Sequence, residues 1–462
     1  MRDRLPAAAD KGDSLMPPNV GEPTVAPSTH RGQTIAQKII ARHAGREHVE
    51  VGEYLSCVPD HVVTQELYWP THKENLEKIG AKGLARPDKA IIVIDHTAAA
   101  AVGSRHAATH KLLKELTERF GIENFFGPNT GLRHLVLVER GFARPGSLVF
   151  SDEGNIASIG AVGALNIPTS ADILVPLLKD ENWLRVPKTV RINLFGQLAF
   201  GVSARDVVQS IIRDYGSGEF LQCCVEYGGP GVHDLTLDDR QTILASTFHT
   251  MSDTAIMEVD DVALAYVDER ANGRPYETIF SDPDAQYERV IDIDLSCIEP
   301  LVTVPPELTG AQPVSLLAGT PIHQATIGSC AGNRLQDMRD AAAILSGRTI
   351  ARKVTLYISP GSQNVYAQAA REGLLAIFAT AGATVLSPGC NTCWGYLGVL
   401  NENENSISTH QFNYQGRNGA ETARIFLASP LTVAASAVCG EIVDPRILLG
   451  EARSPNALME AD

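Results

Sequence analysis

The segment Thr384–Cys393, Thr-Val-Leu-Ser-Pro-Gly-Cys-Asn-Thr-Cys, places two cysteines three residues apart, directly after a short apolar run. The run at 384–386 predicts a buried strand, and the proline and glycine that follow it predict a turn. Cys390 and Cys393 therefore follow a strand end, which is where α/β sheets place their ligands. A third cysteine, Cys330, ends an earlier stretch that reads Ala-Thr-Ile-Gly-Ser-Cys.

Two neighbouring cysteines and a distant third can hold three corners of a cubane iron-sulfur cluster, which four thiolates normally close. The iron at the open corner can then bind a substrate oxygen and act as a Lewis acid. A zinc site or ordinary core thiols would need the same residues, so the trio alone leaves these alternatives open. We interpret the other cysteines as core or incidental thiols, because none lies in a comparable motif: Cys57, Cys223, Cys224, Cys297 and Cys439.

Outward from this segment, predicted strands and helices alternate along the chain. Residues 90–95 form a continuous apolar run bounded by polar residues, which is typical of a strand buried on both faces. Ser203 is a suitable N-cap for a helix at 204–215 that ends before Gly216. We also expect helices at 106–120, 334–345 and 364–381, and strands at 354–358 and 384–386. This alternation predicts an α/β fold.

The composition indicates a soluble, cytoplasmic protein. The 462 residues carry a formal charge of −15 and are 44% apolar, and no stretch approaches the length of a membrane span. A broad nucleic-acid surface is not expected on so acidic a chain. The eight cysteines are sparse and lie mostly in apolar surroundings, which favours a reducing compartment over a disulfide framework.

The chain length predicts about three domains, preceded by an extension. Residues 1–33 contain several prolines and no helical or strand period, so we predict that they are disordered. They lack the apolar h-region of a secretory signal, and their acidic residues disfavour a transit peptide. An acidic and then proline-rich stretch at 282–314 marks a domain crossing. The predicted domains are 34–188, 189–305 and 306–462, the last of which carries Cys330, Cys390 and Cys393.

Several motifs follow one another in a fixed order between residues 33 and 449. They are Ile79–Lys82, Val93–His96, Ile291–Ser296 running up to Glu299-Pro300, Ile327–Cys330, Pro388–Cys390 with Cys393, Ser408-Thr409 and Gly416-Arg417. In this order they resemble the large subunit of the 3-isopropylmalate dehydratase branch of the aconitase superfamily. The resemblance implies three α/β domains around a central cleft, without the swivelling fourth domain that aconitase carries.

The resemblance also implies a cofactor and a partner. In that family three cysteines hold a [4Fe-4S] cluster whose fourth iron binds the hydroxyl and carboxylate of a hydroxy acid, and Cys330, Cys390 and Cys393 match them. The catalytic serine base lies on the swivelling domain, which is a separate small subunit in isopropylmalate dehydratases. Only a short tail follows Glu451 here, so we expect the base to come from another chain.

Further site residues are implied by the same resemblance. Asp95 and His96 match a pair beside the cluster, where the carboxylate orients the imidazole and raises its basicity. Polar positions near the family's active site are matched by His134, Asp152 and Glu226, and Arg417 matches an arginine that binds a substrate carboxylate. Without the resemblance, the pair would be a strand-end cap and a surface histidine, and the others would be ordinary structural or solvated side chains.

The chain departs from the family at the substrate loops. The usual Asp-Ser-His-Thr is Asp-Glu-Gly-Asn at 152–155, so Gly154 replaces a histidine and leaves space that Glu153 or a substrate group could occupy. Phe412 replaces an arginine that binds substrate carboxylate, and loss of such a charge pair costs about 2–5 kcal/mol. We therefore expect an acid with fewer carboxylates or a more apolar group. The predicted substrate-binding residues are Arg417, Phe412, Gln411, Arg334 and Glu153.

Two functions fit these residues. The first is an iron-sulfur-dependent hydro-lyase or isomerase, which needs a base for the proton alpha to a carboxylate and an acid for the departing hydroxide. It would act on a hydroxy acid other than 3-isopropylmalate. The alternative is an aconitase-like chain that has lost dehydratase activity and has a binding, regulatory or different catalytic role. The cysteines favour the first function, whereas Gly154 and Phe412 keep the second open.

Overall fold

The computed structural model describes residues 32–98, 103–216, 218–395 and 397–452. The predicted extension at 1–33 lies outside these ranges except for its last two residues. Gly32 forms a bridge with Ala285, and the backbone N–H of Gln33 donates to Asp282 Oδ2 at 2.7 Å. The last two residues of the predicted extension therefore belong to the described fold, and the prediction of disorder for the rest concerns residues outside the described ranges.

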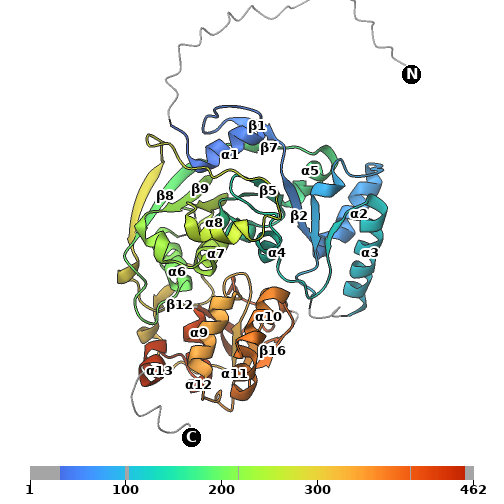
Figure 1. Ribbon diagram of the computed structural model, residues 1–462. Helices are drawn as coiled ribbons and strands as arrows, with labels where there is room; N and C mark the ends of the chain where they lie inside the picture. Colours follow the sequence, from blue (N-terminus) through green and yellow to red (C-terminus); the bar gives the residue numbers. More distant parts are fainter. Residues whose placement is uncertain (1–31, 99–102, 217, 396, 453–462) are drawn as a thin grey trace, which may run out of the picture. The chain divides into compact units, whose positions relative to one another are not determined.

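The fold alternates helices and strands, which confirms the predicted α/β class (Figure 1). The helices of the described residues are α1 (Ile35–His43), α2 (Trp69–Lys78), α3 (Ser104–Phe120), α4 (Arg133–Glu139), α5 (Leu174–Lys179), α6 (Ala204–Tyr215), α7 (Leu237–Thr247), α8 (Asp261–Asp268), α9 (Leu335–Leu345), α10 (Gln363–Arg371), α11 (Leu374–Ala381), α12 (Pro430–Cys439) and α13 (Pro445–Ala452). None of these helices combines the length and the apolar character needed to cross a membrane.

The first two large sheets are parallel throughout. The five-stranded sheet has the order β4 (Asn124–Phe126), β3 (Ala90–Val93), β2 (His61–Gln65), β5 (Leu148–Ser151) and β6 (Leu165–Pro168). The four-stranded sheet has the order β10 (Thr254–Met257), β9 (Cys223–Gly228), β8 (Lys188–Phe195) and β11 (Arg289–Asp294). Every residue of β3, β5 and β9 is buried, as expected for parallel strands covered on both faces.

The third large sheet is mixed, and a short ribbon completes the set. Its order is β13 (Ala311–Pro313), β12 (Leu301–Thr303), β18 (Arg424–Ala428), β17 (Asn405–Ser408), β14 (Gln324–Ile327), β15 (Thr355–Ile358) and β16 (Thr384–Val385). The strand β12 pairs antiparallel with both neighbours, and the other pairs are parallel. Separately, β1 (Tyr54–Cys57) pairs antiparallel with β7 (Asn182–Arg185).

One apolar core joins the five-stranded and four-stranded sheets, and the seven-stranded sheet packs on a separate apolar core. Val63 and Ile91 of the five-stranded sheet share one buried cluster with Ile192 and Val225 of the four-stranded sheet. A second cluster covers the seven-stranded sheet. The strand β12 belongs to that sheet although it precedes the predicted division at residue 305. The division into three domains stays a prediction.

Local signals explain why most elements begin and end as predicted. The hydroxyl of Ser203 accepts from the N–H of Arg205, and Asp206 completes the capping box. The helix α6 ends at Tyr215, directly before Gly216, as expected. The single helix predicted at 364–381 is wrong, because the structure has α10 and α11 there. Gly373 separates them with φ of 76°, a left-handed conformation that interrupts a helix.

We expect Ser203→Ala to lower the free energy of unfolding by about 0.5–2 kcal/mol, because the first turn of α6 loses its capping acceptor. Urea denaturation at an unchanged m-value measures the loss. Ser203→Thr keeps a hydroxyl at this position and should lose less. An equal loss in both variants would contradict the capping role.

The candidate site forms where loops after several parallel strands meet. Asp95 and His96 follow β3, Asp152 to Asn155 follow β5, Cys330 follows β14 and Cys390 follows β16. Backbone hydrogen bonds join the loops of the first and third sheets. The N–H of Cys390 donates to the carbonyl of Asp95 at 2.8 Å, and the N–H of Leu132 donates to the carbonyl of Gly361 at 2.8 Å.

Candidate active site

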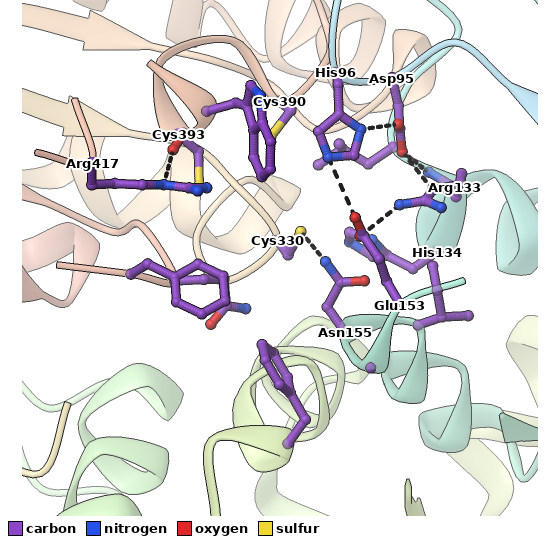
Figure 2. A pocket seen from close by; sticks show the side chains of 17 residues that line it. Asp95, His96, Arg133, His134, Glu153, Asn155, Cys330, Cys390, Cys393 and Arg417 are labelled. Carbon is purple, nitrogen blue, oxygen red and sulfur yellow. Dashed lines mark hydrogen bonds and ion pairs between the residues drawn. The ribbon is translucent and has the colours of Figure 1, made fainter. Parts of the chain in front are cut away.

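A cavity of about 180 Å³ lies where these loops meet, and most of the predicted site residues line it (Figure 2). The predicted residues in its wall are Asp95, His96, His134, Glu153, Cys330, Cys390, Cys393, Gln411, Phe412 and Arg417. Figure 2 shows Arg417 beside Cys393 on one side of Cys330, and His96, Asp95 and Glu153 on the other.

The three predicted cluster cysteines lie together as buried free thiols. Polar side chains donate to two of the sulfurs: Asn155 Nδ2 lies 3.1 Å from Cys330 Sγ, and Ser329 Oγ lies 3.1 Å from Cys393 Sγ. The hydrogen bond from Cys390 to Cys393 holds the pKa of the Cys393 thiol well below its usual value, although burial opposes this. The same bond raises the pKa of Cys390.

The loop conformations next to these cysteines are unusual for their residue types. Ser329 and Asn391, which adjoin Cys330 and Cys390, have φ of 67° and 46°. Residues other than glycine rarely adopt such values, and they persist only where surrounding contacts fix them. Three sulfurs on one cavity, with hydrogen-bond donors aimed at them, fit the donor set of an iron-sulfur cluster. The same residues therefore could hold the predicted cofactor.

A buried arginine organises the acid side of the cavity. Arg133, the first residue of α4, donates from Nε to Asp95 Oδ2 at 3.0 Å and from Nη2 to Glu153 Oε2 at 2.6 Å. Its Nη1 donates to Asp152 Oδ1. Arg133 is 1% exposed, so these carboxylates compensate its charge in a site with little water.

His96 lies between two of the same carboxylates. Its Nδ1 is 2.7 Å from Asp95 Oδ1, and its Nε2 is 3.5 Å from Glu153 Oε1. Burial disfavours a charged imidazole, but the negative charges of Asp95 and Glu153 outweigh burial and raise the pKa of His96 to about 9. His96 therefore carries a proton at neutral pH. These three residues and the arginine form the network marked in Figure 2.

His134 differs from His96 in both charge and contacts. Burial and the nearby charge of Arg334 hold the pKa of His134 well below its usual value, so its imidazole is neutral. Its Nε2 and Asn155 Oδ1 are buried without a hydrogen-bond partner among the described residues. Both residues line the cavity, where a polar ligand that reached these two atoms would give them a hydrogen-bond partner.

Arg417 supplies a positive charge that no carboxylate of the described residues neutralises. Its Nε donates to the carbonyl of Cys393 and its Nη1 donates to Tyr414 Oη, each at 2.9 Å. The guanidinium also lies 4.5 Å from the ring centroid of Trp394 and 5.2 Å from that of Phe412. An anionic ligand in the cavity would find its charge partner here.

Three predicted residues do not line the cavity. Asp152 lies behind its wall, bonded to Arg133 and to the N–H of Gln65. Arg334 is buried and donates to Gln241, Thr242 and the carbonyl of Cys330. Glu226 lies elsewhere in the fold, where it accepts from Arg191, Ser281, Tyr287 and the N–H of Ile35.

The position of Glu226 corrects the expectation that it lies near the active site. Its partners connect β9 to the start of α1 and to the 281–287 loop, so the contacts are those of a structural ion pair. Gln411 lines the cavity, but its amide is already bonded: Oε1 accepts from Ser246 and lies 3.0 Å from His249 Nε2, and Nε2 donates to the carbonyl of Ala245. Its role toward a substrate stays a prediction.

Sequence reasoning missed six residues of the wall: Leu132, Arg133, Asn155, Ile156, Phe248 and Trp394. Trp394 directly follows Cys393 and could have been found from that position. The carboxylate partners of Arg133 come from separate strand ends, and only the fold brings them together. Phe248 follows α7, a segment without a recognisable motif, so it carried no signal.

Comparison with known proteins defines the class. The model of the Aconitase family (aconitate hydratase) matches residues 37–317 and 306–440, so this chain belongs to the aconitase family. Among curated proteins, the chain is 35% identical over 414 residues to the probable 3-isopropylmalate dehydratase large subunit of Methanothermobacter thermautotrophicus. That alignment covers 89% of this chain and 98% of the relative.

Other relatives agree. The 3-isopropylmalate dehydratase large subunit 1 of Pyrococcus furiosus is 36% identical over 419 residues, covering 90% of this chain and 98% of that protein. Among solved structures, the holo-form of Thermococcus kodakaraensis aconitase X aligns with a TM-score of 0.48 at 11% identity. It covers 85% of this chain and 90% of that one, and a likeness this weak supports no inference.

We expect Arg133→Met to lower the free energy of unfolding by about 3–5 kcal/mol, because it leaves buried carboxylates without their charge partner. Arg42→Met is the control, since Arg42 forms an exposed pair with Glu277 and should cost about 1 kcal/mol or less. Denaturant titration of both variants measures the difference. Similar losses would show that the buried network contributes little.

Proposed function

We propose that this chain is the cluster-bearing subunit of an iron-sulfur hydro-lyase that acts on a hydroxy carboxylic acid. The observation that carries the proposal is the cavity itself, whose wall joins three buried cysteines to His96, which is held between two carboxylates, and to Arg417, which has no carboxylate partner among the described residues. The sequence identity of 35–36% with 3-isopropylmalate dehydratase large subunits, over about nine tenths of the chain, supports the same reaction class.

Cys330, Cys390 and Cys393 would hold a [4Fe-4S] cluster, which supplies a Lewis acid to the departing hydroxyl when it is bound. Ser329 and Asn155 donate to two of the ligand sulfurs and so stabilise negative charge on them. A zinc site would use the same thiolates. Because zinc and an iron-sulfur cluster use the same ligands, the metal analysis described below distinguishes between them.

His96 is the proposed acid. It holds its proton between Asp95 and Glu153 and can transfer it to the hydroxyl as the C–O bond breaks. Asp95 keeps the ring oriented because Arg133 fixes the carboxylate. Arg417 binds a carboxylate of the substrate and holds the reacting carbon near the sulfurs.

The base that removes the alpha proton is proposed to come from a separate small subunit. Within the described ranges, Asp95 and Glu153 are the carboxylates in the cavity wall, and both are already bound to Arg133 and His96. His134 is a weak base because its pKa is held well below the usual value. The relatives are themselves large subunits, which agrees with a partner chain.

The substrate is proposed to carry fewer carboxylates than 3-isopropylmalate, or a more apolar group. Phe412 stands in the cavity wall where the resemblance predicts an arginine, and the ring of Trp394 also lies close to the Arg417 guanidinium. One guanidinium among aromatic rings suits one carboxylate next to apolar surface. Glu153, which is bonded to Arg133, would repel a second carboxylate.

Anaerobic reconstitution with iron and sulfide should give broad visible absorbance and bound iron in the wild-type protein. Cys390→Ala should lose both, because the cluster loses a thiolate ligand. Cys297→Ala is the matched control, since Cys297 is exposed and remote in sequence from the cluster loops. Unchanged iron content in Cys390→Ala would refute the ligand assignment, and bound zinc without visible colour would refute the cluster.

Activity is tested with the reconstituted chain and a candidate small subunit, by following alkene formation in the ultraviolet. The compounds are 3-isopropylmalate, citrate, apolar-substituted 3-hydroxy monocarboxylic acids, in which the proton removed is alpha to the carboxylate, and monoesters of hydroxy diacids. We expect the less charged compounds to have a kcat/KM at least about tenfold higher, corresponding to about 1.4 kcal/mol. Phe412→Arg should shift this preference toward the diacid, whereas Phe412→Leu should not.

Ordinary turnover of 3-isopropylmalate with no preference for the less charged compounds would show that Phe412 does not redirect specificity. No alkene from any compound, although the cluster is intact and the small subunit bound, would favour the alternative of a chain without dehydratase activity.

A further inference from the structure

Gly154 does not leave open space beside the cavity, contrary to the expectation from sequence. A Cβ atom added at Gly154 would lie 3.1 Å from Phe248 Cβ and 3.2 Å from Phe248 Cγ. Contacts this close require the neighbour to move, and a side chain longer than a methyl group would run into the phenyl ring. Phe248 therefore fills the volume that a side chain at position 154 would need.

Phe248 and Phe412 form a continuous aromatic surface, although 164 residues of sequence numbering separate them. Their ring centroids are 6.0 Å apart in an edge-to-face arrangement, a geometry favourable to aromatic pairs. Both rings line the cavity and both are only partly buried, so each has surface left for a ligand. The ring of His249 supports Phe412 from behind, at 5.0 Å.

Two polar groups next to this surface already have partners, whereas Asn155 Oδ1 has none among the described residues. Glu153 is bonded to Arg133, and Asn155 Nδ2 donates to Cys330. Between them, Gly154 contributes only backbone to the wall. The guanidinium of Arg417 lies 5.2 Å from the Phe412 ring, so a charge site directly adjoins the aromatic surface.

We propose that Phe248 and Gly154 act as one specificity element, which together with Phe412 forms a subsite for a branched or aromatic substituent. This inference rests on the proposed function, because the substituent belongs to the hydroxy acid whose carboxylate binds Arg417. It narrows the substrate class to a hydroxy acid with a bulky apolar group close to that carboxylate. Phe248 determines specificity and takes no part in the chemical step.

The steric half of the proposal is tested without catalysis. Gly154→Val should lower the melting temperature in the wild-type background, because its methyl groups collide with Phe248. In the Phe248→Ala background the same change should cost little, since the ring is gone. Additive effects in this double-mutant cycle would overturn the pairing of the two residues.

The recognition half uses calorimetry on the anaerobically reconstituted protein, with 4-methylpentanoate and acetate as probes. Both carry one carboxylate, and only the first carries a branched apolar group. Phe248→Ala should weaken binding of 4-methylpentanoate by about 10- to 200-fold, the range for lost apolar contacts in a pocket, and leave acetate unchanged. Phe280→Ala, an exposed aromatic outside the cavity wall, should change neither.

A compensating variant tests whether binding depends on apolar volume at this place in the wall or on phenylalanine at position 248 itself. Gly154→Leu combined with Phe248→Ala moves the apolar bulk to the opposite side of the contact, and should recover at least part of the binding of 4-methylpentanoate. If Phe248→Ala binds each probe as tightly as the wild-type protein does, the proposed subsite is overturned, even if the chain proves to be a hydro-lyase. Selective binding without any hydro-lyase turnover would support the subsite while the proposed reaction failed.

Discussion

The buried guanidinium of Arg133 is the interaction on which the candidate site depends. It compensates carboxylates that follow two different strands, Asp95 after β3 and Asp152 with Glu153 after β5. Without it these carboxylates would repel one another in a region with little solvent, and without them its own charge would be unpaired. Arg133 therefore fixes the distance between the ends of β3 and β5. The carboxylates held there, Asp95 and Glu153, position His96 and raise its pKa.

The third sheet is attached to the same frame. Leu132, which precedes Arg133, donates its N–H to Gly361, and Cys390 donates its N–H to Asp95. These bonds bring the cysteine loops to the acid side of the cavity. They also help to explain how Ser329 and Asn391 keep a left-handed backbone, since conformations of this kind need contacts that fix them.

The sequence predicts those parts of the molecule that depend on neighbouring residues. The ends of α6 follow from Ser203 and Gly216, and the α/β class follows from the alternation of elements. Gly373 divides the helix predicted at 364–381, and a glycine inside a helical pattern is itself a signal for such a break. Motif order placed Asp95, His96 and the three cysteines, and the structure gathers these residues around one cavity.

Residues whose roles depend on distant partners were not predictable in the same way. Glu226 has its partners at Ile35, Arg191, Ser281 and Tyr287, and no local pattern indicates that burial. In the sequence, Phe248 has no feature that distinguishes it from a core aromatic residue, because its contact with Gly154 is formed only in the folded structure.

The backbone hydrogen bond between Cys390 and Asp95 has a consequence for how the protein can change during evolution. Main-chain atoms make this joint, so substitutions of side chains elsewhere in the wall do not break it. Coordinated changes at positions such as 154, 248 and 412 would therefore leave the sulfurs in register with His96. On the proposed function, the fold would separate the reactive centre from the recognition surface, so that new substrates could be accommodated without rebuilding the chemistry.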